Sequence, residues 1–357
     1  MCFAKIALQF LKSNIMKKFF SLTMACIAMF LCSCSKNDLN NPVVNSTDAA
    51  NTLSAAEAAP LKLLRSNTVN YGALIGFPTA QGSLSFQLNV ADQVGVSCLR
   101  ARTLVPATGP TSILNSKYKI LLNFNSDYEG TPLPFVTDMT KYKTDLNNIL
   151  ATYTILPVVA VIENEESNKY YYSGTAEEYI RQLNTAIPIM HARGIKVANG
   201  GITNIGLNYL VYQDLLAQGK TDSAARFKLL TRLTPKSAGT QERGAFVNTL
   251  LTNYARMNLD YINFHWKGTS PDTESLNQVI NYLRKVTRKP IINNELGQFD
   301  TDPNTLLSHI QLCTNQNLPY IVWYSPDESD EKKGMPLQHS DQSLTSSGFG
   351  YQGYLKN

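Results

Sequence analysis

The chain has 357 residues, 43% of them hydrophobic and 17% charged, and a formal net charge of +5. Four of its lysines and none of its acids lie in residues 1–33, so the chain without that segment has a net charge of 5 − 4 = +1. This balance gives no electrostatic reason to expect nucleic acid as a partner. The four histidines are scattered and no Cys/His cluster has zinc-ligand spacing, so we expect no metal site and no other cofactor.

The first 33 residues are typical of an export signal. Met16-Lys-Lys-Phe-Phe is followed by an apolar run and then by Leu31-Cys-Ser-Cys-Ser, and a basic start, a short apolar region and small residues mark a secretory signal. Leu31, three residues before Cys34, resembles the start of a bacterial lipoprotein box, which implies cleavage before Cys34 and lipid attachment to its thiol. We therefore expect an extracytoplasmic protein that a lipid anchors to a bacterial membrane. The alternatives are an ordinary signal peptide or a retained anchor, and the short, interrupted apolar run disfavours the anchor.

Residues 34–68 are rich in Asn, Ser, Thr and Ala and have little to bury, so we expect a flexible tether there. Residues 69–357 then form one folded domain, and their number is ordinary for a single α/β barrel. We expect this domain to be a monomer. Its two cysteines, Cys98 and Cys313, have apolar neighbours, which favours buried free thiols over a disulfide.

Eight short runs rich in apolar residues recur along this domain, and we predict that each is a β-strand. The fourth run has the Val and Ile content of a strand that is buried on both faces, as in parallel sheets covered by helices. The eight runs are Tyr71–Phe77, Gly95–Arg102, Tyr118–Phe124, Leu156–Glu166, Gly194–Asn199, Asp260–His265, Pro290–Gly297 and Pro319–Tyr324.

Helical patterns separate the strands. Thr175 to Glu178 has the form of a capping box, and Asp302 with Pro303 has the form of an N-cap followed by a first-turn proline. Alternating strands and helices require crossover connections, which make neighbouring strands parallel. Eight such units predict an α/β fold with a single (β/α)8 barrel, whereas six or fewer would predict an open, doubly wound sheet. The first two connections have room for short helices, and residues 204–243 hold more helix than one crossover needs, which predicts an elaborated loop on the active face.

The carboxyl ends of the fourth and seventh predicted strands carry acids. In a barrel these two ends lie across the same mouth, so Glu165 and Glu295 are expected to face each other over a cleft. Such a pair suits cleavage of a glycosidic bond, in which one protonated carboxyl assists the leaving oxygen and one ionised carboxylate attacks the anomeric carbon. A separation of about 5 Å between the carboxyls would give retention of configuration, and a much larger one would give inversion.

Asn164-Glu165 at the end of strand four and Glu295 at the end of strand seven resemble the two signatures of the clan A glycoside hydrolases. The resemblance implies that Glu165 is the general acid/base, that Glu295 is the nucleophile, and that Asn164 binds the sugar hydroxyl next to the scissile carbon. Arg100 resembles the arginine that keeps the nucleophile ionised in that clan. His265 resembles its substrate-side histidine.

The chain also departs from the clan pattern. The clan has a tyrosine near strand six that touches the nucleophile, whereas this chain has Trp266 and Lys267 there. The clan's Asn-Glu pair is commonly followed by proline, and here it is followed by Glu166. Regular alternation along the strand would put Glu163 on the same side as Glu165, so the choice between these two acids stays open.

Aromatic and amide side chains near the strand ends complete the expected sugar site. Trp323, on strand eight, resembles the clan's aromatic floor. Trp266, Tyr324 and the run Tyr170–Tyr172 are candidates for stacking on sugar rings. Asn199, at the end of strand five, is a candidate for binding a sugar hydroxyl.

We therefore expect a lipid-anchored, retaining glycoside hydrolase that acts on a β-linked poly- or oligosaccharide and needs no cofactor. The positive charge beside the nucleophile would come from Arg100 or from Arg102, which shares its face. The first alternative is a non-catalytic glycan-binding lipoprotein on the same barrel, which the missing strand-six tyrosine favours. A second alternative is a metal-dependent barrel hydrolase, which the shortage of histidine at the strand ends disfavours.

Overall fold

The computed structural model describes residues 68–76, 84–106, 112–126, 132–269, 272–327 and 335–357. All of them belong to one compact unit, Lys62–Asn357. The expected signal segment, the lipidated Cys34 and nearly all of the tether lie outside the described residues and stay predictions, as does the monomeric state. No helix in the described part of the chain is long and apolar enough to span a bilayer.

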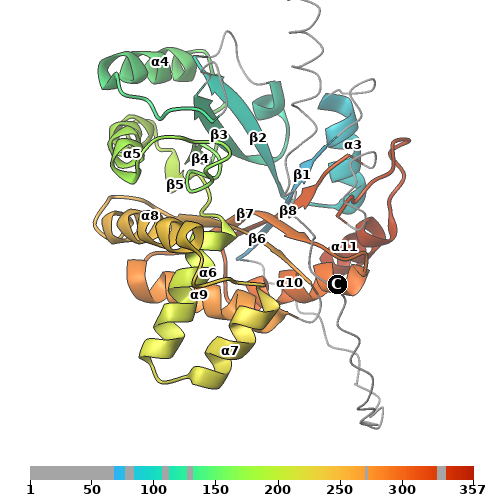
Figure 1. The fold of residues 1–357 in the computed structure, drawn as a ribbon. Coiled ribbons are helices and arrows are strands. Elements are labelled where there is room, and N and C mark those ends of the chain that lie inside the picture. The colour runs from blue at the N-terminus through green and yellow to red at the C-terminus, as the bar shows by residue number, and fades with distance from the viewer. Residues whose placement is uncertain (1–67, 77–83, 107–111, 127–131, 270–271, 328–334) are drawn as a thin grey trace, which may run out of the picture. The chain divides into compact units, whose positions relative to one another are not determined.

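Eight parallel strands form one sheet that curls into a nearly closed barrel (Figure 1). Their order is β5-β4-β3-β2-β1-β8-β7-β6, and β5 and β6 are joined at the pairs Ala198–Tyr261 and Ile202–Phe264. Every predicted apolar run overlaps one strand, so the predicted α/β barrel is confirmed. The strands are β1 Asn70–Ile75, β2 Cys98–Val105, β3 Lys119–Ser126, β4 Val159–Ile162, β5 Lys196–Asn199, β6 Ile262–Gly268, β7 Ile291–Gln298 and β8 Tyr320–Ser325.

Helices cover the outside of the strands (Figure 1). They are α3 Leu84–Val94, α4 Met139–Ala151, α5 Ala176–His191, α6 Asn204–Ala217, α7 Thr221–Leu230, α8 Ala238–Tyr254, α9 Thr273–Thr287, α10 Pro303–Asn315 and α11 Ser346–Lys356. Sequential contacts run from α3 through α11, α10, α9, α8 and α5 to α4, so these helices line up around the strands. The connection from β2 to β3 carries a short 3₁₀ turn, Ser112–Asn115. The extra helical segment that was predicted after β5 is a helical hairpin of α6 and α7, and it packs on the outer helix α9.

Two apolar layers follow from the alternation of side chains along the strands. The inner layer fills the barrel and contains strand residues such as Leu121, Val161 and Val322. The outer layer lies between strands and helices, and the intervening strand residues, such as Ile162 and Ile321, pack there. Because both faces of the sheet are buried, the strands include stretches in which apolar residues follow one another in the sequence.

Local sequence signals also predicted helix boundaries. Thr175 begins α5 with a capping box. Asp302 caps α10, and Pro303 occupies the first turn of that helix. Cys98 and Cys313 are buried free thiols, as predicted.

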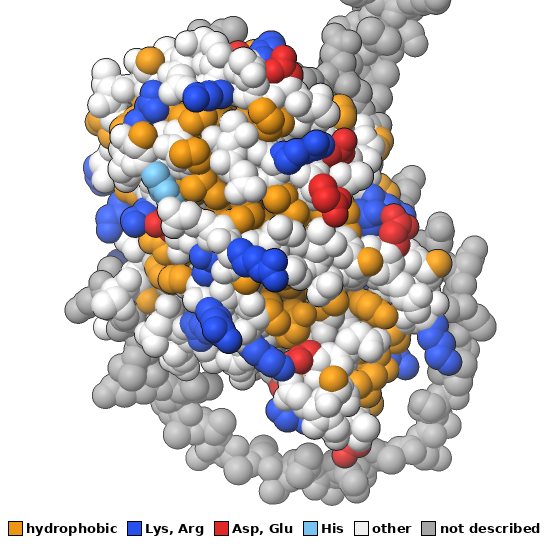
Figure 2. Space-filling view, turned by 90° about the vertical axis from the view of Figure 1, so that its left-hand side faces the viewer, with side chains coloured by type: hydrophobic (Ala, Val, Ile, Leu, Met, Phe, Trp, Pro, Cys, Tyr) orange, Lys and Arg blue, Asp and Glu red, His pale blue; other side chains and the backbone are white. Residues whose placement is uncertain are grey.

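Figure 2 shows one face of the molecule, on which basic and acidic side chains are scattered among neutral ones and apolar side chains form small groups. The basic side chains do not gather in one patch on this face.

Candidate active site

The segment after β4 carries three glutamates that point in different directions. β4 ends at Ile162, and the backbone then takes left-handed conformations at Glu163 (φ 65°) and Glu165 (φ 54°). Such conformations are uncommon outside glycine and persist where the surrounding structure holds them. The expectation that alternation places Glu163 and Glu165 on one side does not hold, because the regular strand has already ended.

Glu163 points toward α5 and is fully buried. Its carboxylate accepts hydrogen bonds from the backbone N–H and the hydroxyl of Ser126, from the hydroxyl of Tyr172 (2.8 Å) and from the side-chain amide of Gln182 on α5 (2.5 Å). Burial raises the pKa of Glu163, although these donors favour the ionised form. Glu163 therefore anchors the segment from outside the barrel and is not open to a substrate.

Glu166 is buried on another side of the segment. Its Oε1 accepts hydrogen bonds from Nδ2 of Asn199 (2.7 Å) and from the hydroxyl of Tyr254 on α8 (2.8 Å). Burial raises the pKa of Glu166 to about 7. Asn199 is itself fully buried and bonded to Asn263. The structure thus places Asn199 beneath the candidate site, where it supports other side chains and does not reach a sugar as expected.

β7 turns two consecutive side chains into the barrel. Its pairing with β8 is irregular between Asn293 and Leu296, and its pairing with β6 shifts register next to His265. An irregularity of this kind re-aims side chains, so Asn294 and Glu295 both contact His265 in the interior.

Glu295 is surrounded by cationic groups. Nη1 of Arg100 lies 2.5 Å from Oε2, Nζ of Lys267 lies 3.2 Å from Oε1, and Nδ1 of His265 lies 3.6 Å from Oε2. Burial by itself would raise the pKa of Glu295, but the charges of His265, Lys267 and Arg100 hold it well below its usual range. Glu295 is therefore an ionised carboxylate at neutral pH.

Glu165 faces Glu295 with a different set of neighbours. Its Oε1 lies 3.0 Å from Nδ1 of His265, and its Oε2 accepts a hydrogen bond from Nδ2 of Asn168 (2.8 Å). One oxygen of Glu165 and one of Glu295 lie within 4.8 Å of each other. The contacts with arginine and lysine belong to Glu295, so the two acids have different electrostatic environments.

Buried asparagines fix the orientation of His265. The backbone N–H of Asn294 donates to Oδ1 of Asn263 (3.1 Å), so Asn263 donates through Nδ2 to Oδ1 of Asn294 (2.7 Å). Oδ1 of Asn294 is therefore an acceptor, and Nε2 of His265, 2.8 Å away, must carry a hydrogen. The other ring nitrogen, Nδ1, is the one that faces the two acids.

Arg100 links the two acidic segments. It contacts Glu295 through Nη1, donates through Nη2 to Oδ1 of Asn164, and donates through Nε to Oδ1 of Asn123 (3.1 Å). Asn164 is thereby held next to the carboxylates, as expected. Arg102 is exposed at its position on β2. Of the two arginines considered, Arg100 is therefore the one that lies beside Glu295.

Sequence reasoning missed Asn123, Asn263 and Asn294, which form a polar layer beneath the two acids. Each is almost fully buried in its strand. A buried amide needs hydrogen-bond partners. Asparagine at an inward position of a buried strand was therefore the signal that could have identified this layer.

The two tryptophans lie in the outer apolar layer, and neither offers a ring face to a ligand. Trp266 is 2% exposed and Trp323 is 0% exposed. The indole N–H of Trp323 donates to the carbonyl oxygen of Met335 (2.9 Å). This placement corrects the expected sugar contacts, because alternation turns Trp266 to the opposite face of β6 from His265.

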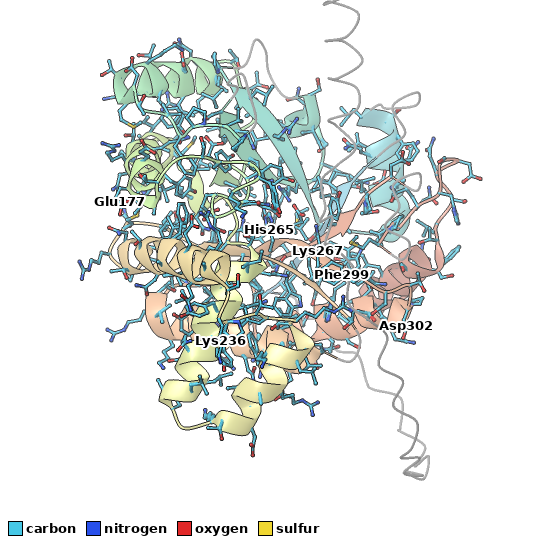
Figure 3. The ribbon with its side chains drawn as sticks, in the orientation of Figure 1. Glu177, Lys236, His265, Lys267, Phe299 and Asp302 are labelled. Atoms are coloured by element: carbon cyan, nitrogen blue, oxygen red, sulfur yellow. The ribbon has the colours of Figure 1, made fainter. Side chains whose placement is uncertain are left out.

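Three other aromatic side chains lie on β8 or follow β7 and β4. The ring of Tyr324 on β8 has Nζ of Lys267 4.7 Å from its centroid. Figure 3 shows Lys267 near the centre of the strand layer and Phe299 beyond it. Phe299 follows β7 and Tyr170 follows β4, and both rings are exposed. These exposed rings follow the two strands that carry the acids, so they provide apolar surface at the same end of the barrel. The hydroxyl of Tyr172 donates a hydrogen bond to Glu163 instead.

A cation at this site would have to compete with protein charges. Glu165, His265 and Glu295 could supply three donor atoms within 4.8 Å of one another. Arg100 and Lys267 already contact the two oxygens of Glu295, and their charges repel a metal ion. These residues fit a metal poorly, and we assign none of them as a ligand.

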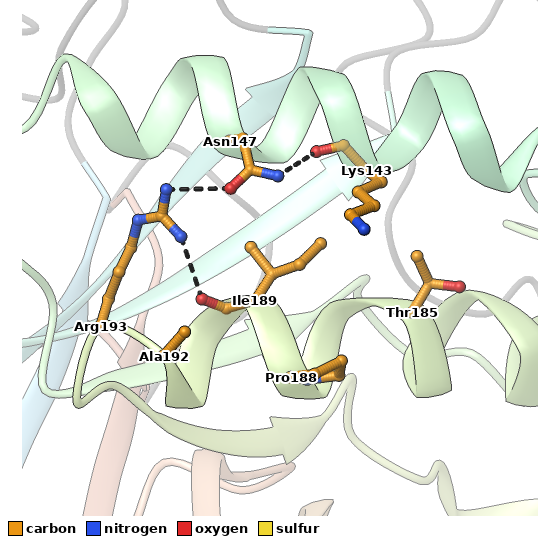
Figure 4. Close-up of a pocket in the computed structure, with 7 residues that line it drawn as sticks. All are labelled: Lys143, Asn147, Thr185, Pro188, Ile189, Ala192 and Arg193. Atoms are coloured by element: carbon orange, nitrogen blue, oxygen red, sulfur yellow. Dashed lines mark hydrogen bonds between the residues drawn. The ribbon is translucent and has the colours of Figure 1, made fainter.

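A groove between α4 and α5 lies in the outer helical layer (Figure 4). Arg193 crosses it, donating to Oδ1 of Asn147 (2.9 Å) and to the carbonyl oxygen of Ile189 (3.2 Å). These contacts tie the two helices together. The groove is lined by Lys143, Asn147, Thr185, Pro188, Ile189, Ala192 and Arg193, with no carboxylate among them.

Comparison with known proteins adds information on the fold. No family model matches the sequence, and no curated protein matches it significantly. Solved structures do match. A GH128 (subgroup I) endo-β-1,3-glucanase from Amycolatopsis mediterranei, in a complex with laminarihexaose, has a TM-score of 0.51 and 12% identity, and the match covers 80% of this chain and 99% of that chain.

Two further structures give similar values. A GH128 (subgroup VI) exo-β-1,3-glucanase from Aureobasidium namibiae has a TM-score of 0.50 and 12% identity, covering 80% of this chain and 96% of that chain. A GH128 (subgroup II) endo-β-1,3-glucanase from Sorangium cellulosum has a TM-score of 0.50 and 12% identity, covering 80% of this chain and 98% of that chain. At these identities the likeness shows the fold alone.

Proposed function

We propose that this protein is a retaining glycoside hydrolase of β-linked glycans, with Glu165 as the general acid/base and Glu295 as the nucleophile. The observation that carries the proposal is the approach of the two carboxylates to within 4.8 Å at the ends of β4 and β7, near the separation of about 5 Å that suits retention. Their surroundings support different roles. Cations hold Glu295 ionised, while Glu165 is bonded to a histidine and an amide.

In the first step, an oxygen of Glu295 attacks the anomeric carbon as the bond to the leaving glycosidic oxygen breaks. Glu165 gives its proton to that leaving oxygen. Nδ1 of His265 faces Oε1 of Glu165 at 3.0 Å, and two bare acceptors at this distance would repel each other. A hydrogen bond between these two atoms therefore needs a proton on one of them, and Glu165 is the side chain that would pass a proton to the leaving oxygen.

In the second step, Glu165 is a carboxylate and takes a proton from a water molecule, whose oxygen attacks the anomeric carbon. The ester bond to Glu295 breaks, and Glu295 leaves as a carboxylate beside Arg100 and Lys267. Two displacements at one carbon retain the configuration of the sugar. All of the groups in this scheme are side chains, the glycan and water.

β-1,3-Glucan is the first substrate to test, because three solved structures that are similar in fold to this chain are β-1,3-glucanases. We would incubate residues 35–357 with a panel of β-linked polysaccharides and analyse the products. The proposal expects release of oligosaccharides or glucose from at least one glycan, with retained configuration by NMR. Release that Glu165→Gln and Glu295→Gln leave unchanged would contradict the assigned roles.

The alternative function is glycan binding without turnover, which the absence of the strand-six tyrosine favours. Calorimetry on the same panel separates the two proposals. Saturable binding with no released sugar after long incubation would support a binding protein. Loss of hydrolysis with a chelator, restored by a metal ion, would instead support a metal-dependent hydrolase.

We also propose that Cys34 carries a lipid that anchors the protein to a bacterial membrane on its extracytoplasmic side. The support is the signal segment and its lipoprotein-like box. Fractionation of cells that express the full chain tests the proposal. We expect the wild type in the membrane fraction and Cys34→Ala in the soluble one, and an unchanged distribution would refute the anchor.

A further inference from the structure

Lys267 projects into the candidate active site from β6. It lies two residues after His265, so alternation puts both side chains on the inner face of the strand. Lys267 pairs in register with Gly297 on β7, as His265 pairs with Glu295. Figure 3 shows His265 and Lys267 near each other at the centre of the fold.

The side chains of Lys267 and Met335 both lie against Gly297. A Cβ atom on Gly297 would lie 2.9 Å from Sδ of Met335, 3.3 Å from Cγ of Lys267 and 3.8 Å from Cε of Lys267. The aliphatic stem therefore runs directly over the glycine, and the ammonium reaches Oε1 of Glu295 at 3.2 Å. The side chain of Lys267 is 13% exposed, so its charge interacts with Glu295 in a largely desolvated setting.

Tyr324 provides a second contact for the ammonium. Nζ of Lys267 lies 4.7 Å from the centroid of its ring, which is within the range of a cation–π interaction. Tyr324 is on β8 and Glu295 is on β7, so the ammonium lies between groups on two neighbouring strands. These contacts restrict Nζ to a position beside the carboxylate.

The two oxygens of Glu295 have different cationic partners. Arg100 and His265 approach Oε2, and Lys267 approaches Oε1. A carboxylate held at one oxygen can still rotate, whereas one held at both has a defined plane. We propose that Lys267 is a positioning residue for Glu295, which orients this carboxylate for attack and keeps it ionised. This inference rests on the proposed function.

The charged and titratable groups that face Glu295 come from four elements. They are Arg100 on β2, His265 and Lys267 on β6, Glu165 after β4, and Tyr324 on β8. Removing the charge of Lys267 leaves the other groups in place and disfavours ionisation of Glu295. The pKa of Glu295 then rises. As the pH is lowered, Glu295 is therefore protonated, and activity is lost, at a higher pH than in the wild type.

The test compares Lys267→Met, which keeps the length of the side chain and removes its charge, with Lys267→Arg, which keeps the charge. Lys236→Met is the matched control, because Lys236 is exposed between α7 and α8 and lies away from Lys267 in Figure 3. The probe is 2-deoxy-2-fluoro-β-D-glucosyl fluoride, and its covalent attachment to Glu295 is followed by mass spectrometry. The pH dependence of kcat/KM is measured on the glycan that the wild type cleaves.

We expect Lys267→Met to slow both labelling and kcat/KM by about 10-fold to 100-fold, the value of a charge-assisted hydrogen bond. The loss should appear in kcat and not in KM. The acid limb of the pH profile of kcat/KM should move to higher pH in Lys267→Met. Lys267→Arg should recover most of the rate. Unchanged labelling and an unchanged acid limb in Lys267→Met would overturn the proposal, as would a loss confined to KM.

A second measurement separates this proposal from the proposed function. If the wild type is not labelled and cleaves no glycan, the hydrolase assignment fails, and ¹³C NMR titration of the Glu295 carboxylate decides the role of Lys267 by itself. A higher pKa of Glu295 in Lys267→Met than in wild type supports the electrostatic contact. The same titration in both proteins refutes it.

Discussion

Glu163 and Glu165 are two residues apart in the chain and lie in opposite kinds of surroundings. Glu163 is sealed between the strands and α5, where Ser126, Tyr172 and Gln182 donate to its oxygens. Glu165 lies at the open end of the barrel, within 4.8 Å of Glu295 and bonded to His265. An acid with all its acceptor sites occupied supports structure, and an acid that faces a second acid within about 5 Å can do chemistry. The left-handed conformations at both residues produce this separation.

Replacement of the nucleophile candidate should have the largest effect. Glu295→Gln keeps the shape of the side chain but removes the attacking charge, so we expect the rate of glycan hydrolysis to fall by at least about 10³-fold. Glu177→Gln, at an exposed position in the first turn of α5, is the control and should be fully active. Hydrolysis by Glu295→Gln at the rate of the control would contradict the assignment of Glu295 as the nucleophile.

Replacement of the acid/base candidate should have a large effect that depends on the leaving group. Glu165→Gln cannot protonate the leaving oxygen, so hydrolysis of a polysaccharide should fall by about 10²–10⁴-fold. An aryl β-glucoside with a strongly acidic phenol needs no such help, and its first step should be nearly as fast as in wild type. Stopped-flow release of the phenol measures that step. An equal loss with both kinds of substrate would contradict the role of Glu165.

Glu166 should make the folded protein less stable as pH rises. The pKa of Glu166 is raised from 4.5 to about 7 in the folded state, so the unfolded chain loses this proton first. Stability attributable to this group is therefore fully present below pH 4.5, falls as pH rises, and is about 3 kcal/mol lower above pH 7. Glu166→Gln should remove this decline, as measured by urea unfolding at several pH values. Parallel curves for variant and wild type would show that Glu166 does not titrate in this range.

Glu163→Gln should have the smallest effect on chemistry and a moderate one on stability. The new amide NH₂ would face N–H and O–H groups that donate to Glu163 in the wild type. Buried donors without acceptors cost about 1–3 kcal/mol, which urea unfolding would detect. Residual activity per folded molecule should stay well above that of Glu165→Gln. A full loss of activity with unchanged stability would place Glu163 in the chemistry and reverse the comparison.

Much of the fold could be predicted because its signals are local. Each strand includes a stretch rich in apolar residues, since both faces of a covered parallel sheet are buried. Capping residues such as Thr175 and Asp302 act on backbone groups of the adjacent turn, so they mark helix starts without knowledge of the rest of the chain. The placement of Glu165 and Glu295 at strand ends followed from the same patterns together with the geometry of a barrel.

The orientations of individual side chains could not be predicted in the same way. The irregular pairing of β7 turns both Asn294 and Glu295 inward, and no residue type in that stretch signals a bulge. The two tryptophans matched an expectation for aromatic residues near the site, yet alternation and packing put them in the outer layer.

The sequence by itself determined the eight strands, their parallel order and the presence of acids at the ends of two of them, because these depend on hydrophobic periodicity and on the direction of the chain. The tertiary structure decided which acid of the segment after β4 faces Glu295 and which charges surround Glu295. Those features depend on contacts between residues far apart in the chain, such as Arg100 with Glu295 and Glu165 with His265. Physical proximity of that kind has no local pattern in the sequence.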